Sequence, residues 1–120
     1  MASGMGRITT HVLDTANGRP GAGMKIEFSV FEGQGWKHLK TVTTNKDGRT
    51  DEPLAEGALQ PGQYRIVFHV AAYFRALGNK LDEPPFLDRV PLRFGIADAS
   101  AHYHVPLLCS PWGYTTYRGS

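Results

Sequence analysis

Residues 101–108 read Ala101-His102-Tyr103-His104-Val105-Pro106-Leu107-Leu108. This stretch is one of several β-prone segments that lie between turn signals, and it predicts a β-strand. Successive side chains of a strand point to opposite faces, so His102 and His104 share one face. Two imidazoles side by side are an unusual strand face, and they suggest that this face lines a site.

The rest of the chain repeats the same pattern of short strands and turns. Asn17-Gly18 and Asn45-Lys46-Asp47-Gly48 are among the separators, and their residues favour tight turns. A helix of about two turns is predicted only over 71–77, where Gly78 follows as a C-cap. This spacing predicts one all-β domain, a sandwich or barrel, with further strands at 7–13, 24–31, 36–44, 63–70, 90–96 and 114–117.

The first predicted strand carries a third histidine. Alternation places His11 on the same face as Thr9 and Leu13, opposite Ile8 and Val12. A lone histidine in a strand is more often structural or solvent-exposed than functional, so a purely structural role for each of these histidines stays open. A further alternative is a zinc site formed by His102, His104 and His11, although an acidic residue that would orient such ligands is not evident nearby.

Length and composition limit the classes of protein to consider. The chain has 120 residues, 13 basic and 11 acidic, for a formal net charge of +2 without a basic stripe. We therefore expect no nucleic-acid or membrane partner, and instead a small-molecule substrate or another protein chain. The single cysteine, Cys109, favours a reducing compartment, which we expect to be the cytoplasm, or the peroxisome in a eukaryote.

Three stretches together resemble the transthyretin-like family, and they cover both ends and the middle of the chain. They are Ile8-Thr9-Thr10-His11-Val12-Leu13-Asp14 with Asn17-Gly18-Arg19-Pro20, then Thr44-Asn45-Lys46-Asp47-Gly48-Arg49, and His102 through Ser120. The terminal Tyr117-Arg118-Gly119-Ser120 resembles the tetrapeptide that distinguishes the hydrolases of this family from its thyroid-hormone carrier.

The resemblance implies a fold, an assembly and a reaction. The fold is a β-sandwich of two four-stranded sheets with one short helix, spanning 7–120 after a tail or expression scar at 1–6. The assembly is a homotetramer, a dimer of dimers, whose central channel holds the sites. The reaction opens the ring of 5-hydroxyisourate, from urate catabolism, to 2-oxo-4-hydroxy-4-carboxy-5-ureidoimidazoline without metal or cofactor.

The resemblance also implies the site. It predicts four catalytic residues, His11, Arg49, His104 and Ser120, which also bind substrate together with the terminal residues Tyr117, Arg118 and Gly119. From the chemistry of ring opening we expect His104, with His11 and a relay through Ser120, to activate water, and Arg49 to hold the substrate oxygens. The division of roles between the two histidines stays open at this point. The alternatives that stay open are a carrier that binds an aromatic ligand without turnover, and the metal-dependent hydrolase.

Overall fold

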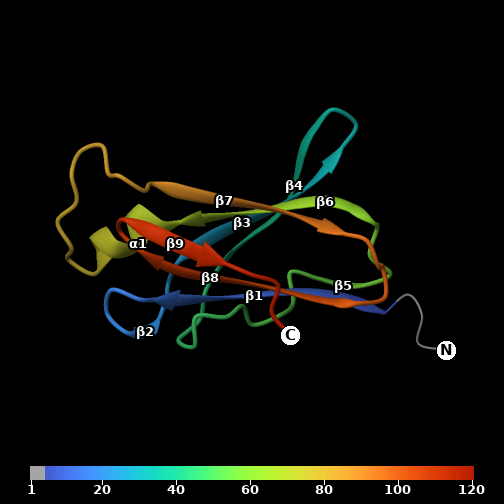
Figure 1. Cartoon of the computed structure of the whole chain (residues 1–120), viewed down its shortest axis with the longest axis horizontal. Coiled ribbons are helices and arrows are strands. Elements are labelled where there is room, and N and C mark those ends of the chain that lie inside the picture. The colour runs from blue at the N-terminus through green and yellow to red at the C-terminus, as the bar shows by residue number, and fades with distance from the viewer. Residues whose placement is uncertain (1–4) are drawn as a thin grey trace.

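The computed structural model describes residues 5–120, and these form a two-layered β-sandwich with one short helix at an end (Figure 1). The strands are β1 (Gly6–Asp14), β2 (Arg19–Pro20), β3 (Lys25–Glu32), β4 (Gly35–Thr43), β5 (Ala55–Gly57), β6 (Gly62–His69), β7 (Arg89–Ile96), β8 (His102–Ser110) and β9 (Gly113–Thr116), and the helix is α1 (Val70–Ala76). The predicted all-β class and single short helix are confirmed, with boundaries shifted by one or two residues.

The two sheets have the strand orders β2-β1-β8-β9 and β4-β3-β6-β7. The first also contains β5, which pairs with the beginning of β1, so it has five strands where four were expected. Strands β2 and β5 span only two and three residues, too short for a recognisable alternating pattern. Strands β1 and β8 pair in parallel, whereas the other pairs are antiparallel.

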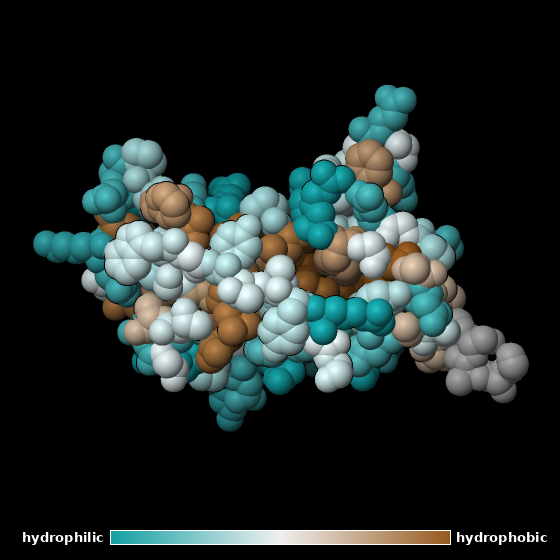
Figure 2. All heavy atoms as spheres, viewed as in Figure 1, coloured by the Kyte–Doolittle hydropathy of each residue, from teal (hydrophilic) through white to brown (hydrophobic). Residues whose placement is uncertain are grey.

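The core lies between the sheets and is filled by alternate side chains of each strand. On β1 the inward side chains include Ile8 and Val12, which are 0% and 1% exposed. Opposite them the second sheet contributes residues such as Phe28 and Phe68. The inward positions of β1 also include Thr10, which is 2% exposed and donates a hydrogen bond to the Val105 carbonyl, while the alternate positions of β1 lie on the outer face. In the space-filling view, apolar surface is visible along the seam between the layers (Figure 2).

A buried carboxylate fixes the helix against the first sheet. Asp14, at the end of β1, is fully buried and accepts hydrogen bonds from the Tyr73 hydroxyl of α1 and the Asn17 side chain, each at 2.7 Å. These bonds, with those from the Ala16 and Asn17 backbone amides, lower the pKa of Asp14 although burial opposes the shift. The Asp14 carboxylate therefore connects α1 to the end of β1, in the sheet that carries the histidines.

The start of the domain differs slightly from the expected boundary. Strand β1 begins at Gly6, which pairs with Gly57, whereas a tail was expected over residues 1–6. Residues 1–4 lie outside the described residues. Among residues 5–120, no helix has the length and apolar character that crossing a membrane requires.

Candidate active site

The parallel pairing of β1 with β8 brings the three predicted histidines together. The register sets Thr9 beside His104 and Arg7 beside His102. Because Ile8 on β1 and Tyr103 on β8 point into the core, the alternate residues project from the outer face of the sheet. As predicted, His102 and His104 lie on one face of their strand, and Thr9 and His11 lie on one face of theirs. The pairing of the two strands joins these faces into a single surface.

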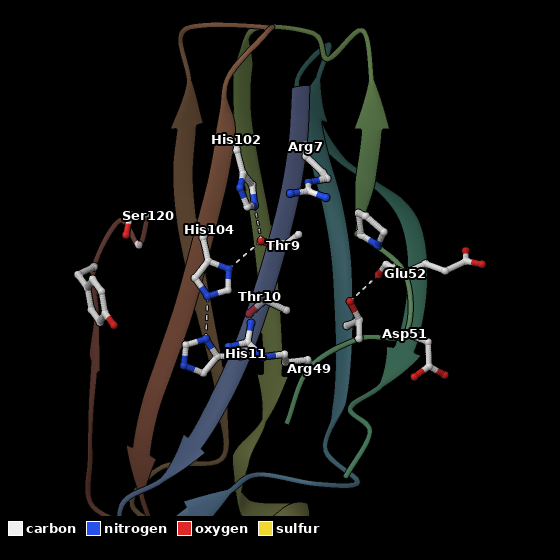
Figure 3. A pocket seen from close by; sticks show the side chains of 14 residues that line it. Arg7, Thr9, Thr10, His11, Arg49, Asp51, Glu52, His102, His104 and Ser120 are labelled. Carbon is white, nitrogen blue, oxygen red and sulfur yellow. Dashed lines mark hydrogen bonds between the residues drawn. The ribbon is translucent and has the colours of Figure 1, made fainter. Parts of the chain in front are cut away.

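On this surface four side chains form a continuous row of hydrogen bonds (Figure 3). His102 Nε2 lies 2.7 Å from Thr9 Oγ1, which lies 2.7 Å from His104 Nδ1. His104 Nε2 in turn lies 2.7 Å from His11 Nδ1. Both nitrogens of His104 are therefore occupied, whereas among the described residues no side chain or backbone group hydrogen-bonds to His11 Nε2.

Burial and charge keep the inner two imidazoles neutral. Burial, together with the nearby His11, Arg49 and His102, lowers the pKa of His104 to about 4. The pKa of His11 is also lowered, first by burial and then by the Arg49 guanidinium. At neutral pH both rings are therefore unprotonated, which is the state that can accept a proton.

Arg49 reaches this surface because a tight turn places it there. The side chain of Asn45 accepts hydrogen bonds from the backbone amides of Asp47 and Arg49 at 2.9 and 3.1 Å. Gly48 has a positive φ of 73°, and its carbonyl accepts the Val12 amide at 2.8 Å. The turn thus attaches to β1, and Arg49 pairs with His11 in an isolated β-bridge.

The C-terminal segment lies beside His104, on the side of the site formed by β8. The Gly119 amide donates to the His104 carbonyl at 2.7 Å, which brings Ser120 to the site (Figure 3). A Cβ on Gly119 would lie 2.6 Å from His104 Cδ2, so only glycine fits against this imidazole. Steric contact with His104 therefore explains the glycine at position 119 of the terminal Tyr117-Arg118-Gly119-Ser120.

One predicted substrate-binding residue lies elsewhere. The Arg118 guanidinium stacks over the Tyr103 ring at 4.1 Å from its centroid, and it lines a different cavity, shared with Leu92 and Phe94. Gly119 lies against His104, whereas the neighbouring Arg118 points to the other side of this extended segment. Tyr117 lines both cavities. The other predicted residues, His11, Arg49, His104, Tyr117, Gly119 and Ser120, all line one cavity.

That cavity has a volume of about 470 Å³ and is open to solvent on the outer face of the sheet. Sequence reasoning did not assign several of its lining residues to the site, among them Arg7, Thr9, Asp51 and Glu52. The predicted alternation contained a signal for Thr9, which was expected on the face of His11. Nothing in the sequence indicated that β1 pairs with β8.

The three histidines do not converge on a single point. They are linked pairwise in a row, two of them through the Thr9 hydroxyl. Within residues 5–120, no group of three or more His, Cys, Asp or Glu side chains is arranged to hold a metal ion. Four of their six ring nitrogens are hydrogen-bonded to one another or to the Thr9 hydroxyl.

A model of the HIUase/Transthyretin family matches residues 8–119. The chain belongs to this family. Among curated members, "5-hydroxyisourate hydrolase 2" of Rhizobium meliloti strain 1021 is 61% identical over 116 residues, which are 96% of this chain and 97% of that protein. "5-hydroxyisourate hydrolase" of Pseudomonas aeruginosa strain PAO1 is 57% identical, covering 97% of this chain and 93% of that protein.

Solved structures of the HIUase/Transthyretin fold agree with the architecture. A crystal structure of (S)-allantoin synthase matches with a TM-score of 0.93 and 41% identity, over 99% of this chain but only 45% of that chain. Klebsiella pneumoniae 5-hydroxyisourate hydrolase matches with a TM-score of 0.79 and 30% identity, over 96% and 94% of the two chains. A structure of sea bream transthyretin in complex with thyroxine matches with a TM-score of 0.83 and 26% identity, over 94% of each chain.

Proposed function

We propose that this chain is a 5-hydroxyisourate hydrolase, which opens the substrate ring with water to give 2-oxo-4-hydroxy-4-carboxy-5-ureidoimidazoline. One observation carries the chemistry: the neutral imidazole of His11, whose Nε2 has no hydrogen-bond partner within residues 5–120, stands next to the permanently charged Arg49 in an open cavity. Hydrolysis of a cyclic amide needs such a base and such a positive group. The substrate is taken from the relatives that are 61% and 57% identical.

In this proposal His11 Nε2 accepts a proton from water, and the resulting hydroxide attacks the ring carbonyl carbon. His11 is chosen over His104 as the base because of hydrogen bonding: both nitrogens of His104 are occupied, whereas His11 Nε2 has no hydrogen-bond partner among residues 5–120. His104 then orients His11 and supports its basicity. Arg49 stabilises the negative charge that develops on the carbonyl oxygen.

The C-terminal residues complete the substrate site in this proposal. Tyr117, Gly119 and Ser120 line the cavity and contact the substrate, with Ser120 offering a hydroxyl for hydrogen bonding. Arg118, predicted to bind substrate, is assigned instead to holding the segment in place through its stacking on Tyr103. No metal or cofactor takes part in any of these steps.

The direct test follows freshly generated 5-hydroxyisourate by ultraviolet absorbance, with and without the purified untagged protein, in buffer that contains a chelator. We expect the protein to accelerate decay well above the spontaneous rate. Activity that the chelator removes and zinc restores would favour the metal-dependent alternative. Folded protein without any acceleration would favour the carrier alternative, and thyroxine binding would then be measured.

Variants of one turn test the role of Arg49. Arg49→Gln should lower kcat/KM on the order of a hundredfold or more, because a charge that stabilises the oxyanion is lost. Arg49→Lys should recover only part of the rate, since an ammonium lacks the planar fork. Lys46→Gln removes a cation from the same turn but outside the cavity lining, so it is the matched control and should stay near the unmodified rate.

We also propose the homotetramer that the family resemblance implies. Strands β7 and β9 are unpaired edges of the two sheets, and edges with free backbone groups favour pairing with another copy. Trp112, Tyr114 and Tyr117 are 68%, 45% and 54% exposed around β9, which is an unusual aromatic surface for a monomer. Light scattering coupled to size exclusion should give four times the 13.2 kDa chain mass; a stable monomer with full activity would contradict this.

For the compartment we propose the cytoplasm, or the peroxisome in a eukaryotic source. The support is Cys109, which is fully buried and unpaired among the described residues, as expected where thiols remain reduced. Burial raises the pKa of this thiol to about 12, so it has no role as a nucleophile.

A further inference from the structure

We propose that Thr9 and His102 are the outer part of a proton relay, through which His11 acts first as a base and then as an acid. This inference rests on the proposed hydrolase function and deepens it. Neither residue belongs to the predicted set of functional residues. The relay is the row His11, His104, Thr9 and His102, in which each neighbouring pair is joined by a hydrogen bond of 2.7 Å.

The row has two arrangements that differ only in the direction of its hydrogen bonds. In the first, His11 Nδ1 donates to His104 Nε2, His104 Nδ1 donates to Thr9 Oγ1, and Thr9 donates to His102 Nε2. His11 Nε2 then carries a lone pair. In the second, every bond is reversed, and His11 Nε2 carries a hydrogen. A threonine hydroxyl is suited to the middle of such a row because it donates one hydrogen bond and accepts others.

Passing one proton along the row converts the first arrangement into the second. Water gives a proton to His11 Nε2, each link passes its own proton outward, and His102 Nδ1 releases one proton to solvent. One proton enters and one leaves, so every imidazole ends neutral. The hydroxide electron pair forms the new bond to the ring carbonyl carbon.

The second arrangement then serves the second half of the reaction. When the carbon–nitrogen bond of the ring breaks, His11 Nε2–H gives its proton to the departing nitrogen. The row reverts to its first arrangement as His102 Nδ1 takes up a proton from solvent. A base that becomes an acid at the same atom is what hydrolysis of an amide needs.

The burial and charge of the row agree with outward transfer. His104 is 9% exposed, whereas His102 is exposed at the rim of the cavity. A proton held on His104 is disfavoured first by burial and then by the neighbouring His11, Arg49 and His102 side chains, which together lower the pKa of His104. Arg7, the neighbour of His102 on β1, lines the same cavity.

A double-mutant cycle tests the relay. Thr9→Val keeps the shape but removes the hydroxyl, and we expect kcat to fall about tenfold to a hundredfold with KM changed less than about twofold. Thr9→Ser restores a hydroxyl and should recover most of kcat. His102→Gln should lower kcat about tenfold, but it should add nothing to Thr9→Val because the row is already interrupted.

Matched controls come from an equivalent pair outside the site. His38 and Thr41 also form an imidazole–hydroxyl hydrogen bond of 2.7 Å, on the exposed strand β4. His38→Gln and Thr41→Val should leave kcat and KM at the unmodified values. Thermal unfolding of all variants checks folding, and His102→Gln alters an exposed side chain, so it tests the relay even if Thr9→Val does not fold.

The outcomes separate the relay from the hydrolase function. An unchanged kcat in His102→Gln would overturn the relay, as would equal losses from His102→Gln in the presence and absence of the Thr9 hydroxyl. A rise in KM alone would also overturn it and make His102 a substrate contact. If the unmodified protein does not accelerate hydrolysis, the proposed function itself fails.

Discussion

At the residue scale, the surroundings of His11 determine the pH range in which it can act as a base. An isolated imidazole has a pKa near 6.5, and both burial and Arg49 lower that of His11. The neutral, proton-accepting ring therefore persists below the pH at which an exposed histidine would be half protonated.

We expect kcat/KM to stay level from pH 8 to 6.5 and to fall only at lower pH, as His11 takes up a proton. The measurement is the initial rate at each pH, corrected for spontaneous decay of the substrate. Arg49→Gln removes the nearby positive charge, so its residual activity should fall at a higher pH than that of the unmodified protein. A midpoint above 6.5 in the unmodified protein would contradict the assignment of His11 as the base.

A second residue-scale prediction concerns Gly119. In Gly119→Ala the new methyl would press on the His104 ring, and relieving the contact moves either the ring or the C-terminal segment. We expect kcat/KM to fall at least about tenfold, because small displacements of catalytic groups are costly. Gly113→Ala is the matched control, since a Cβ there meets nothing within 4 Å. Equal activity of the two variants would show that this close contact is unimportant.

At the element scale, the turn before Arg49 and strand β1 act as one unit. Gly48 combines a positive φ with close contact, because a Cβ there would overlap the Val12 carbonyl oxygen. Gly18 has a similar φ of 66° in a turn where a Cβ would meet nothing within 4 Å. Alanine substitutions at Gly18 and Gly48 therefore distinguish two effects on stability: the strain of a positive φ, which both positions share, and the steric overlap, which occurs only at Gly48.

We therefore expect Gly48→Ala to lower both stability and activity, and Gly18→Ala to lower only stability. The conformational cost at each site is about 1 kcal/mol, and crowding at Gly48 adds to it while moving Arg49 away from His11. Urea unfolding and the hydrolysis assay measure the two effects. Similar activity in both variants would mean that the turn does not position Arg49.

At the scale of the whole molecule, the buried imidazole makes folding depend on pH. The pKa of His104 is near 6.5 in the unfolded chain and about 4 in the folded one. As pH falls through this interval, the unfolded chain binds a proton that the folded chain does not. Stability contributed by the neutral ring is therefore complete above pH 6.5 and is lost progressively toward pH 4.

Lowering the pH from 7 to 5 should reduce the free energy of unfolding by about 2 kcal/mol from His104 alone. The measurement is urea unfolding at fixed protein concentration, and the carboxylates contribute little in this interval. His104→Asn should reduce the pH dependence, whereas His38→Gln on the exposed strand β4 should preserve it. A stability independent of pH between 7 and 5 would contradict the burial of a neutral His104.

The sequence by itself determined the β class, the short helix and the faces of individual strands. These properties are local, since they follow from alternation along one strand and from turn residues such as Asn45 and Gly48. The resemblance added Arg49 and the C-terminal motif, and all of that set except Arg118 lines one cavity.

Only the tertiary structure decided which strands are neighbours. Residues 9 and 104 are far apart in the chain, and their pairing depends on the parallel register of β1 with β8, which side-chain alternation does not encode. That register inserts Thr9 between two histidines and occupies both nitrogens of His104, while His11 Nε2 has no hydrogen-bond partner in the part of the chain that the structure describes. The chemistry of the row therefore arises from packing, because hydrogen-bond partners and burial exist only after the two strands have met.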